Sequence, residues 1–335
     1  MKQIYIGYNQ DEKERQRSTS GGIFIVLAKN VIEQGGIVFG ASLNSKNEVV
    51  HQEVSNVEDL ELLIGSKYVQ SNKGKIFLQV KKYLDLGRLV LFSGTPCEVL
   101  GLKKYLRRDY DTLILVDLLC HGAPSPKVWD KYLKEKNIDT KAKINFRSKI
   151  SGWLKSSITI ETDIYKYESI GANDPYISLF NNGFSMRPSC FKCKIKAIEN
   201  RQSDITLGDF WGVVTLRPDL YDDKGISLIF CNNVKGANFI QKLGKYLYLE
   251  KISKEELLYE NGDIGRPMSR PLKREKFFEE IDTDISIATL KKKYVHISMK
   301  TKMLHSIKTF LKKTGLFDSL KRLYRKLKNN AFYGE

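Results

Sequence analysis

Four of the five cysteines in this 335-residue chain stand in patterns that suit a metal centre. Cys190 and Cys193 form a C-x-x-C pair, a spacing that lets two thiolates bind one metal centre. Cys97 and Cys120 each follow a short apolar run that is typical of a buried strand. Cys231 ends another strand-like run, where a small buried hydrophobe is the simplest interpretation.

Two kinds of metal centre use four thiolates, a [4Fe–4S] cluster and a structural zinc ion. Zinc ribbons usually take their second ligand pair from another C-x-x-C knuckle, and this sequence has only one. The spacing therefore favours iron–sulfur over zinc, with no metal at all as the third alternative.

The segments around these cysteines follow a strand–helix–strand order. Apolar runs at 88–92 and 112–118 predict two buried strands, and 98–108 predicts the helix between them. In a right-handed βαβ unit such strands are parallel neighbours, so Cys97 and Cys120 should emerge together at the carboxyl edge of the sheet. Other segments continue the alternation: a strand at 37–41 and helices at 23–32, 75–86 and 126–137.

The regular alternation ends near residue 140. We predict a mixed α/β and α+β protein with a parallel βαβ core sheet in residues 1–140. Residues 141–282 should form an added α+β region, which holds the C-x-x-C pair and a Gly-Asp-Phe-Trp-Gly loop. Residues 283–335 should form a basic, amphipathic helical tail.

The net charge of +17 is concentrated in the tail, where residues 291–335 hold thirteen Lys and Arg against two acidic residues. This argues against a nucleic-acid-binding face on the folded part. A basic amphipathic helix suits an anionic membrane surface or an acidic partner, and a helix packed on its own domain fits equally well. Neither a signal peptide nor a membrane-spanning run is recognisable, so we expect a cytoplasmic protein; a membrane-binding tail would also make it peripheral at the inner face of the membrane.

Six motifs occur in a distinctive order: Ser18–Gly22, Gly94–Cys97, Asp117–Gly122, Phe146–Lys149 with Gly152-Trp153, Cys190-x-x-Cys193 and Arg201–Gly212. Over roughly residues 15–270 this order resembles the coenzyme F420 hydrogenase/dehydrogenase beta-subunit family. Its members are iron–sulfur flavoproteins that pass electrons between a cluster, a flavin and a second acceptor. The resemblance implies a [4Fe–4S] cluster with four ligands: Cys97, Cys120, Cys190 and Cys193.

A flavin is also implied by the resemblance, with FAD favoured over FMN, in the half formed by residues 1–140. Ser18–Gly22 precede a predicted helix, whose N-terminus suits a flavin phosphate; an ordinary helix cap is the alternative. The candidate cofactor-binding residues are Ser20, Gly21, Gly22, Lys67, Ser71, Gly94 and Thr95.

Several other side chains are candidates for chemistry near these sites. His121 adjoins a proposed ligand, where it could move a proton or be structural. Arg147, Lys149 and Arg201 could bind an acidic substrate or a flavin phosphate, or be solvated surface charges. The sequence lacks G-x-G-x-x-G and P-loop motifs, which argues against a standard dinucleotide fold and against NTP hydrolysis.

Many relatives begin with a cysteine-rich ferredoxin-like segment, whereas no cysteine precedes Cys97 here. We therefore expect a redox partner protein that carries further clusters, together with a small-molecule acceptor or substrate. Coenzyme F420 is one candidate, and the family also extends to loci for surface-polysaccharide biosynthesis. The predicted activity is that of a flavin- and iron–sulfur-dependent oxidoreductase; the alternative is a zinc-stabilised accessory or binding protein without redox chemistry.

Overall fold

The structure is a computed structural model, and it describes residues 3–254, 256–257 and 264–295. Residues up to Lys291 form one compact unit, and a second unit begins at Lys292. The apolar stripe of the predicted tail lies outside the described residues. Within the described part, no helix is both long enough and apolar enough to cross a membrane.

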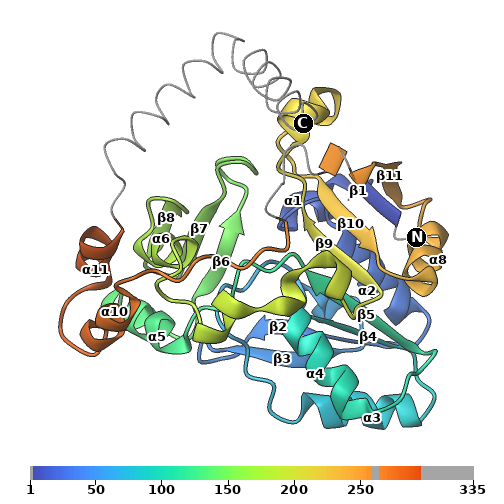
Figure 1. The fold of residues 1–335 in the computed structure, drawn as a ribbon, viewed down its shortest axis with the longest axis horizontal. Helices are drawn as coiled ribbons and strands as arrows, with labels where there is room; N and C mark the ends of the chain where they lie inside the picture. The colour runs from blue at the N-terminus through green and yellow to red at the C-terminus, as the bar shows by residue number, and fades with distance from the viewer. Residues whose placement is uncertain (1–2, 255, 258–263, 296–335) are drawn as a thin grey trace, which may run out of the picture. The chain divides into compact units, whose positions relative to one another are not determined.

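The main sheet has eight strands in the order β11-β1-β10-β9-β5-β4-β2-β3 (Figure 1). Its four central strands run parallel: β2 (Ile37–Leu43), β4 (Val90–Gly94), β5 (Leu113–Leu118) and β9 (Ile205–Asp209). Antiparallel strands flank them: β3 (Val49–Val54) on one side, and β10 (Ser227–Cys231), β1 (Gln3–Asn9) and β11 (Leu247–Lys251) on the other. The predicted parallel βαβ core is confirmed.

Helices cover both faces of the central strands, which explains their nearly continuous apolar sequence. Val90 and Phe92 of β4 belong to one core cluster, and Leu91 between them belongs to the cluster on the opposite face. The helices of the first cluster are α3 (Ile76–Asp85) and α4 (Pro96–Leu106). Those of the second are α2 (Ile23–Glu33), α8 (Val234–Lys242) and the 3-10 helix η1 (Glu58–Leu63).

A small antiparallel sheet contains β6 (Lys143–Ser148), β7 (Ser157–Glu161) and β8 (Lys166–Ile170), drawn in green in Figure 1. Tilted and edge-on aromatic ring pairs join it to the helices α5 (Pro126–Glu135) and α6 (Pro175–Asn181). Residues 141–282 thus supply both this sheet and strands β9–β11 of the main sheet. The two predicted halves share one continuous sheet.

The remaining helices are short, and several occur in the loops that carry the sequence motifs. They are α1 (Glu12–Arg17), η2 (Pro188–Lys192), η3 (Lys194–Lys196), η4 (Ile198–Asn200), α7 (Val213–Leu216), η5 (Pro218–Leu220), α10 (Arg274–Glu280) and α11 (Ile287–Tyr294). The C-x-x-C pair therefore lies in a series of 3-10 turns that follows β8 of the small sheet and α6 in sequence and precedes β9 of the main sheet.

Candidate functional site

A cavity of about 600 Å³ opens at the carboxyl ends of the central parallel strands. Ser93 and Gly94 of β4, Leu118 at the end of β5 and Asp209 of β9 line one wall. The small sheet and α6 supply another wall, with aromatic and aliphatic side chains such as Phe146, Ile170 and Phe180. Open α/β sheets bind ligands at this edge, so the cavity is the leading candidate for a binding site.

Most of the sequence-predicted site residues line this cavity: Ser20, Gly22, Lys67, Ser71, Gly94, Thr95, Cys120 and His121. Gly21 does not. A Cβ at Gly21 would lie 2.5 Å from the carbonyl oxygen of Gly7 and 2.8 Å from the nitrogen of Ser227. Its N–H donates to Ser227 Oγ at 3.0 Å. Gly21 thus allows close packing of the loop against β1 and β10.

The helix predicted after Ser18–Gly22 is confirmed as α2, and its N-terminus opens on the cavity. Gly22 is the N-cap residue and has φ of +80°, a left-handed conformation that favours glycine. Ile23 and Phe24 of the first turn also line the cavity. No side chain in the described residues caps this helix end. Its first N–H groups can therefore serve an anion in the cavity.

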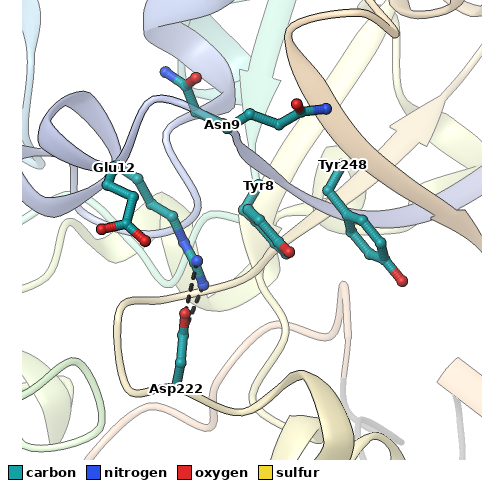
Figure 2. Close-up of a pocket in the computed structure, with 7 residues that line it drawn as sticks. Tyr8, Asn9, Glu12, Asp222 and Tyr248 are labelled. Atoms are coloured by element: carbon teal, nitrogen blue, oxygen red, sulfur yellow. Dashed lines mark hydrogen bonds and ion pairs between the residues drawn. The ribbon is translucent and has the colours of Figure 1, made fainter.

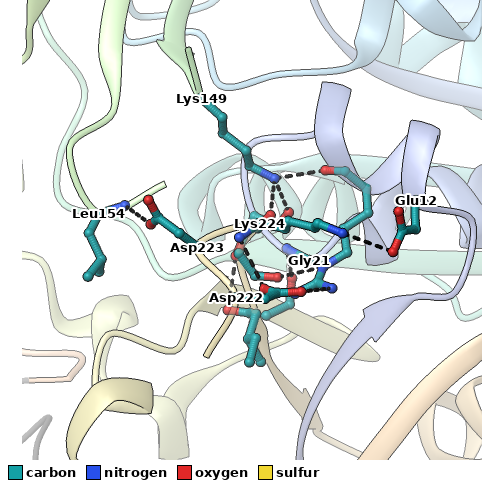
Figure 3. A network of polar contacts seen from close by, with 12 residues as sticks. Glu12, Gly21, Lys149, Leu154, Asp222, Asp223 and Lys224 are labelled. Atoms are coloured by element: carbon teal, nitrogen blue, oxygen red, sulfur yellow. Dashed lines mark hydrogen bonds and ion pairs between the residues drawn. The ribbon is translucent and has the colours of Figure 1, made fainter. Parts of the chain in front are cut away.

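Lys149 holds the loop that precedes α2. Its Nζ donates to the carbonyl oxygens of Arg15 and Ser20, both at 2.7 Å, and of Lys224 at 2.5 Å (Figure 3). Burial lowers the pKa of Lys149 to about 7, and the charge on Arg15 adds to this effect. The three carbonyls occupy all three donors of the ammonium group. Lys149 is therefore a support of the loop and not the anion ligand suggested by the sequence.

Lys67 differs from Lys149 because it lines the cavity itself. Its Nζ donates to the carbonyl oxygens of Leu62 at 3.1 Å and Ile64 at 2.7 Å. Burial lowers the pKa of Lys67 to about 7, although the charge on Glu61 opposes the shift. These two carbonyls account for two of the three ammonium donors.

The four predicted ligands gather at the same edge of the sheet. Cys97 lies in the first turn of α4, Cys120 follows β5, and the N–H of Ala123 donates to Cys190 Sγ at 3.4 Å. Cys97 is exposed at the surface, but partial shielding of its thiol from solvent raises its pKa, and the charges of Cys193 and Cys190 add to the rise. Burial likewise raises the pKa of Cys120 to about 12, with Cys97 and Cys190 contributing. The four thiols therefore share one electrostatic environment.

This donor set is purely thiol, which suits both a [4Fe–4S] cluster and a four-cysteine structural zinc site. In residues 3–254, 256–257 and 264–295, no three His, Cys, Asp or Glu side chains form a ready-made shell around a single metal ion. Cys231 is buried in the core cluster with α2 and α8, as predicted, and is separate from the four-thiol group.

Buried cations fasten the C-x-x-C loop to the loop that carries Cys120. Lys196 Nζ donates to the carbonyl oxygen of His121 at 2.5 Å. Arg201 donates to the carbonyl oxygens of Leu118 at 2.7 Å and Lys196 at 2.9 Å, and it pairs with Asp117 at 3.1 Å. Arg201 is therefore a buried structural clamp that is not among the residues lining the cavity, and the alternative of a solvated surface charge is wrong.

Sequence reasoning missed a polar group on the cavity wall next to α4. The Nδ1 atom of His51 lies 2.6 Å from Ser71 Oγ, and its Nε2 lies 3.1 Å from the carbonyl oxygen of Ser93. Glu98 accepts from the N–H of Thr95 at 2.7 Å and pairs with Lys73 at 2.5 Å. No sequence motif marks His51, because it occurs in an ordinary strand of mixed apolar and polar residues.

Arg147 is at the cavity, as its motif suggested, but it is already paired. It sits where the β6–β7 register shifts between Asn145 and Ser148, and such bulges re-aim side chains. Arg147 Nη1 lies 2.6 Å from Asp209 Oδ2, and Asp209 also accepts from Trp153 Nε1 at 3.2 Å. Burial lowers the pKa of Arg147, but the carboxylate of Asp209 and the hydroxyl of Tyr68 together outweigh burial, so the net direction of the pKa shift is upward.

A second cavity, of about 420 Å³, lies beside α1 (Figure 2). Arg15 forms two hydrogen bonds of 2.8 Å to the carboxylate of Asp222, and its guanidinium lies 3.9 Å from the ring centroid of Tyr8. The cation in this cavity is thus already neutralised. None of the sequence-predicted site residues lines it.

Comparison with known proteins agrees with this architecture. A solved structure of the F420-reducing [NiFe] hydrogenase complex from Methanosarcina barkeri contains a chain with a similar fold. It is 17% identical, with a TM-score of 0.54, and the match covers 83% of this chain and 91% of that chain. The sequence comparison with curated proteins gives no match.

The model of one protein family matches residues 87–256, just over half of the chain. That family is described as the C terminus of the beta subunit in coenzyme F420 hydrogenase/dehydrogenase. The matched segment runs from the start of β4 past β11 and includes all four clustered cysteines. The chain therefore belongs to the coenzyme F420 hydrogenase/dehydrogenase beta-subunit family.

Proposed function

We propose that this protein is an oxidoreductase that transfers electrons between a [4Fe–4S] cluster on its four thiols, a flavin in the 600 Å³ cavity and a second acceptor. One observation carries the proposal. Cys120 lines the cavity and also interacts electrostatically with Cys97 and Cys190. A ligand in the cavity would thus lie against one member of the thiol group, which is the arrangement that short-range electron transfer requires.

The thiols fit a cluster in chemistry and in placement. Cys97, Cys120, Cys190 and Cys193 come from two strand ends and one loop, and neither carboxylate nor imidazole belongs to the set. The family is one of hydrogenases and dehydrogenases, which favours a redox centre over a structural zinc. A zinc-stabilised, non-redox protein remains the alternative.

The cavity fits a flavin, which supplies two-electron chemistry where a cluster supplies single electrons. The first turn of α2, next to Ser20 and Gly22, and the ammonium of Lys67 would hold phosphate groups. Gly94, Thr95 and Ser71 would offer polar groups beside the ring system, and the apolar walls would exclude water. FAD remains favoured over FMN by the resemblance alone.

His121 is our candidate for moving a proton at the cavity wall. Its side chain lines the cavity next to Cys120, with the ring edge-on to Phe180 at a centroid distance of 5.0 Å. Lys196 holds the backbone carbonyl of His121, which fixes the loop that carries the ring. The imidazole can therefore exchange a proton with a cavity ligand without moving the loop.

The structural neighbour belongs to a hydrogenase complex, which supports a partner protein for this chain as well. That partner would carry further clusters. Coenzyme F420 as the acceptor, a role in surface-polysaccharide biosynthesis and peripheral membrane binding through the tail stay predictions.

Purification without oxygen tests the cluster. We expect a broad visible absorbance together with four iron and four sulfide per chain. Cys97→Ser, Cys120→Ser, Cys190→Ser and Cys193→Ser should each lose iron, whereas the matched control Cys231→Ser should keep it. Stoichiometric zinc with no visible absorbance would support the alternative.

The flavin is tested on the same samples by its absorption bands and by release of the free cofactor. Lys67→Ala should lower flavin occupancy while iron content stays at the wild-type level. Lys143→Ala, an exposed lysine in β6, is the control. A wild-type protein that holds a cluster but takes up neither FAD nor FMN would contradict the flavin part of the proposal.

A further inference from the structure

The surface beside the C-x-x-C pair is strongly basic. Residues 187–196 contain four Lys or Arg and no Asp or Glu. Lys196 is buried as a clamp, but Arg187, Lys192 and Lys194 are exposed. None of these three side chains has an ion-pair partner among the described residues. Some exposed cations elsewhere in the unit, such as Arg108, pair with acids, and others do not, so this surface is distinguished by its run of like charges beside the C-x-x-C pair.

A second segment packs against this loop and adds an apolar side chain to the same surface. Arg274 donates to the carbonyl oxygen of Met186, and its guanidinium lies 5.8 Å from the ring centroid of Phe191, between the two cysteines. Two residues before Arg274, Leu272 is 99% exposed, and the neighbouring Lys273 is exposed as well. A leucine so fully exposed gains nothing from the fold that carries it.

We infer that Arg187, Lys192, Lys194 and Lys273, with Leu272 among them, form a docking surface for an acidic electron-carrier protein. This inference rests on the proposed function. An apolar residue within a charged rim is the composition of a transient protein–protein interface. Rim charges of one sign steer an oppositely charged partner and speed its association.

The docking surface includes part of the four-thiol centre, so a partner bound there would be close enough to exchange electrons with it. Cys190 and Cys193 are partly exposed within it, and Cys97 is exposed next to them in the shared thiol environment. A carrier bound here would reach the four-thiol centre without entering the cavity. One electron would pass from the reduced carrier to the four-thiol centre. The carrier would become oxidised, the four-thiol centre would become reduced, and no covalent bond would change.

Charge reversal tests the docking surface in the full-length, cluster-loaded protein. The probe is a small acidic bacterial ferredoxin, reduced beforehand and mixed in a stopped-flow instrument at low ionic strength. The triple variant Arg187→Glu, Lys192→Glu and Lys194→Glu should slow the second-order electron transfer at least about tenfold. The control is Lys141→Glu, Lys143→Glu and Lys166→Glu, three exposed lysines at the small sheet with the same change of charge. It should keep the wild-type rate.

Two further measurements keep the outcome unambiguous. Dithionite should reduce the wild type and both variants equally, and a wild type with no reducible centre would overturn the proposed function itself. The wild-type rate with ferredoxin should fall as salt is added, because salt screens the steering charges. Equal ferredoxin rates in the two triple variants, or a wild-type rate that ignores salt, would overturn the docking surface alone.

Discussion

The two pairs of clustered cysteines reach the same edge of the molecule by different means. Cys97 and Cys120 follow strands β4 and β5, whose residues are buried on both faces by helices. Cys190 and Cys193 lie in a chain of 3-10 turns, and the turn η2 (Pro188–Lys192) has no buried residue. One pair is placed by an apolar core and the other by polar contacts.

The polar contacts of the second pair come from buried cations. Lys196, Arg201 and Arg274 donate to backbone carbonyls of the loops on either side. Such hydrogen bonds are directional, so they can fix a loop that has no hydrophobic core of its own. Removing one partner leaves the other buried and unpaired, which lowers the free energy of unfolding. Damage to the sheet should therefore affect global stability, whereas damage to the clamps should also affect the ligand set.

Removal of the Arg201 clamp should have the largest effect. Arg201→Met leaves the fully buried carboxylate of Asp117 without its ion-pair partner. Breaking a buried pair in this way typically costs about 3–5 kcal/mol. Denaturant unfolding should show this loss of unfolding free energy. The exposed control Arg187→Met should stay within about 0.5 kcal/mol of the wild type. A loss below about 1 kcal/mol for Arg201→Met would remove the distinction between the two regions.

A substitution in the apolar core tests the part of the site that holds Cys97 and Cys120. Leu115→Ala in β5 removes buried methyl groups from the cluster with α3 and α4 and should cost about 3 kcal/mol. Because the thiols are not displaced, the iron content of the folded fraction should remain at the wild-type level. If Leu115→Ala loses iron while it still unfolds cooperatively, the apolar core also determines the positions of the four cysteines.

The Lys196 clamp should give a smaller loss of stability with a larger loss of iron. Lys196→Met removes the hydrogen bond to the carbonyl of His121 and the cation near Cys120, which should cost about 1–3 kcal/mol. Iron per chain should fall below that of Leu115→Ala. Lys192→Met, an exposed lysine in the same loop, is the control for iron content.

The smallest effect is a pH dependence on the cavity side. Burial lowers the pKa of Lys67 from 10.5 to about 7 in the folded protein. Between these values the unfolded chain binds more protons than the folded one, so Lys67 makes the unfolding free energy rise with pH. The rise is at most about 1.4 kcal/mol per pH unit.

Lys67→Met should therefore flatten the stability–pH profile above about pH 7. Paired denaturant titrations of wild type and variant at about pH 7, 8 and 9 measure the difference. Parallel profiles would show that Lys67 keeps its ordinary pKa. The hydrogen bonds of Lys67 to Leu62 and Ile64 would then hold the charged form against burial.

Much of the site was predictable from local patterns. The two apolar runs predicted β4 and β5, and the right-handed connection predicted that Cys97 and Cys120 share an edge. The residues of Ser18–Gly22 predicted a helix N-terminus at the cavity. The basic residues were harder, because Lys149 binds carbonyls that are 75 or more residues away in sequence, and Arg201 binds the carbonyl of Leu118, which is 83 residues away. No sequence motif identifies a backbone carbonyl as the hydrogen-bond acceptor of a distant side chain.

Local sequence was enough to show which strands are buried, which thiols are available and where helices begin, because each depends on the period or type of nearby residues. Long-range packing was needed to show that His51 and Glu98 share the cavity wall with Ser71, and that Gly21 packs against β1. It was also needed to show that buried cations, and not apolar contacts, hold the C-x-x-C loop in place. A hydrogen bond to a backbone carbonyl depends on distance and direction but hardly on the acceptor's residue type, so the sequence carries no record of it.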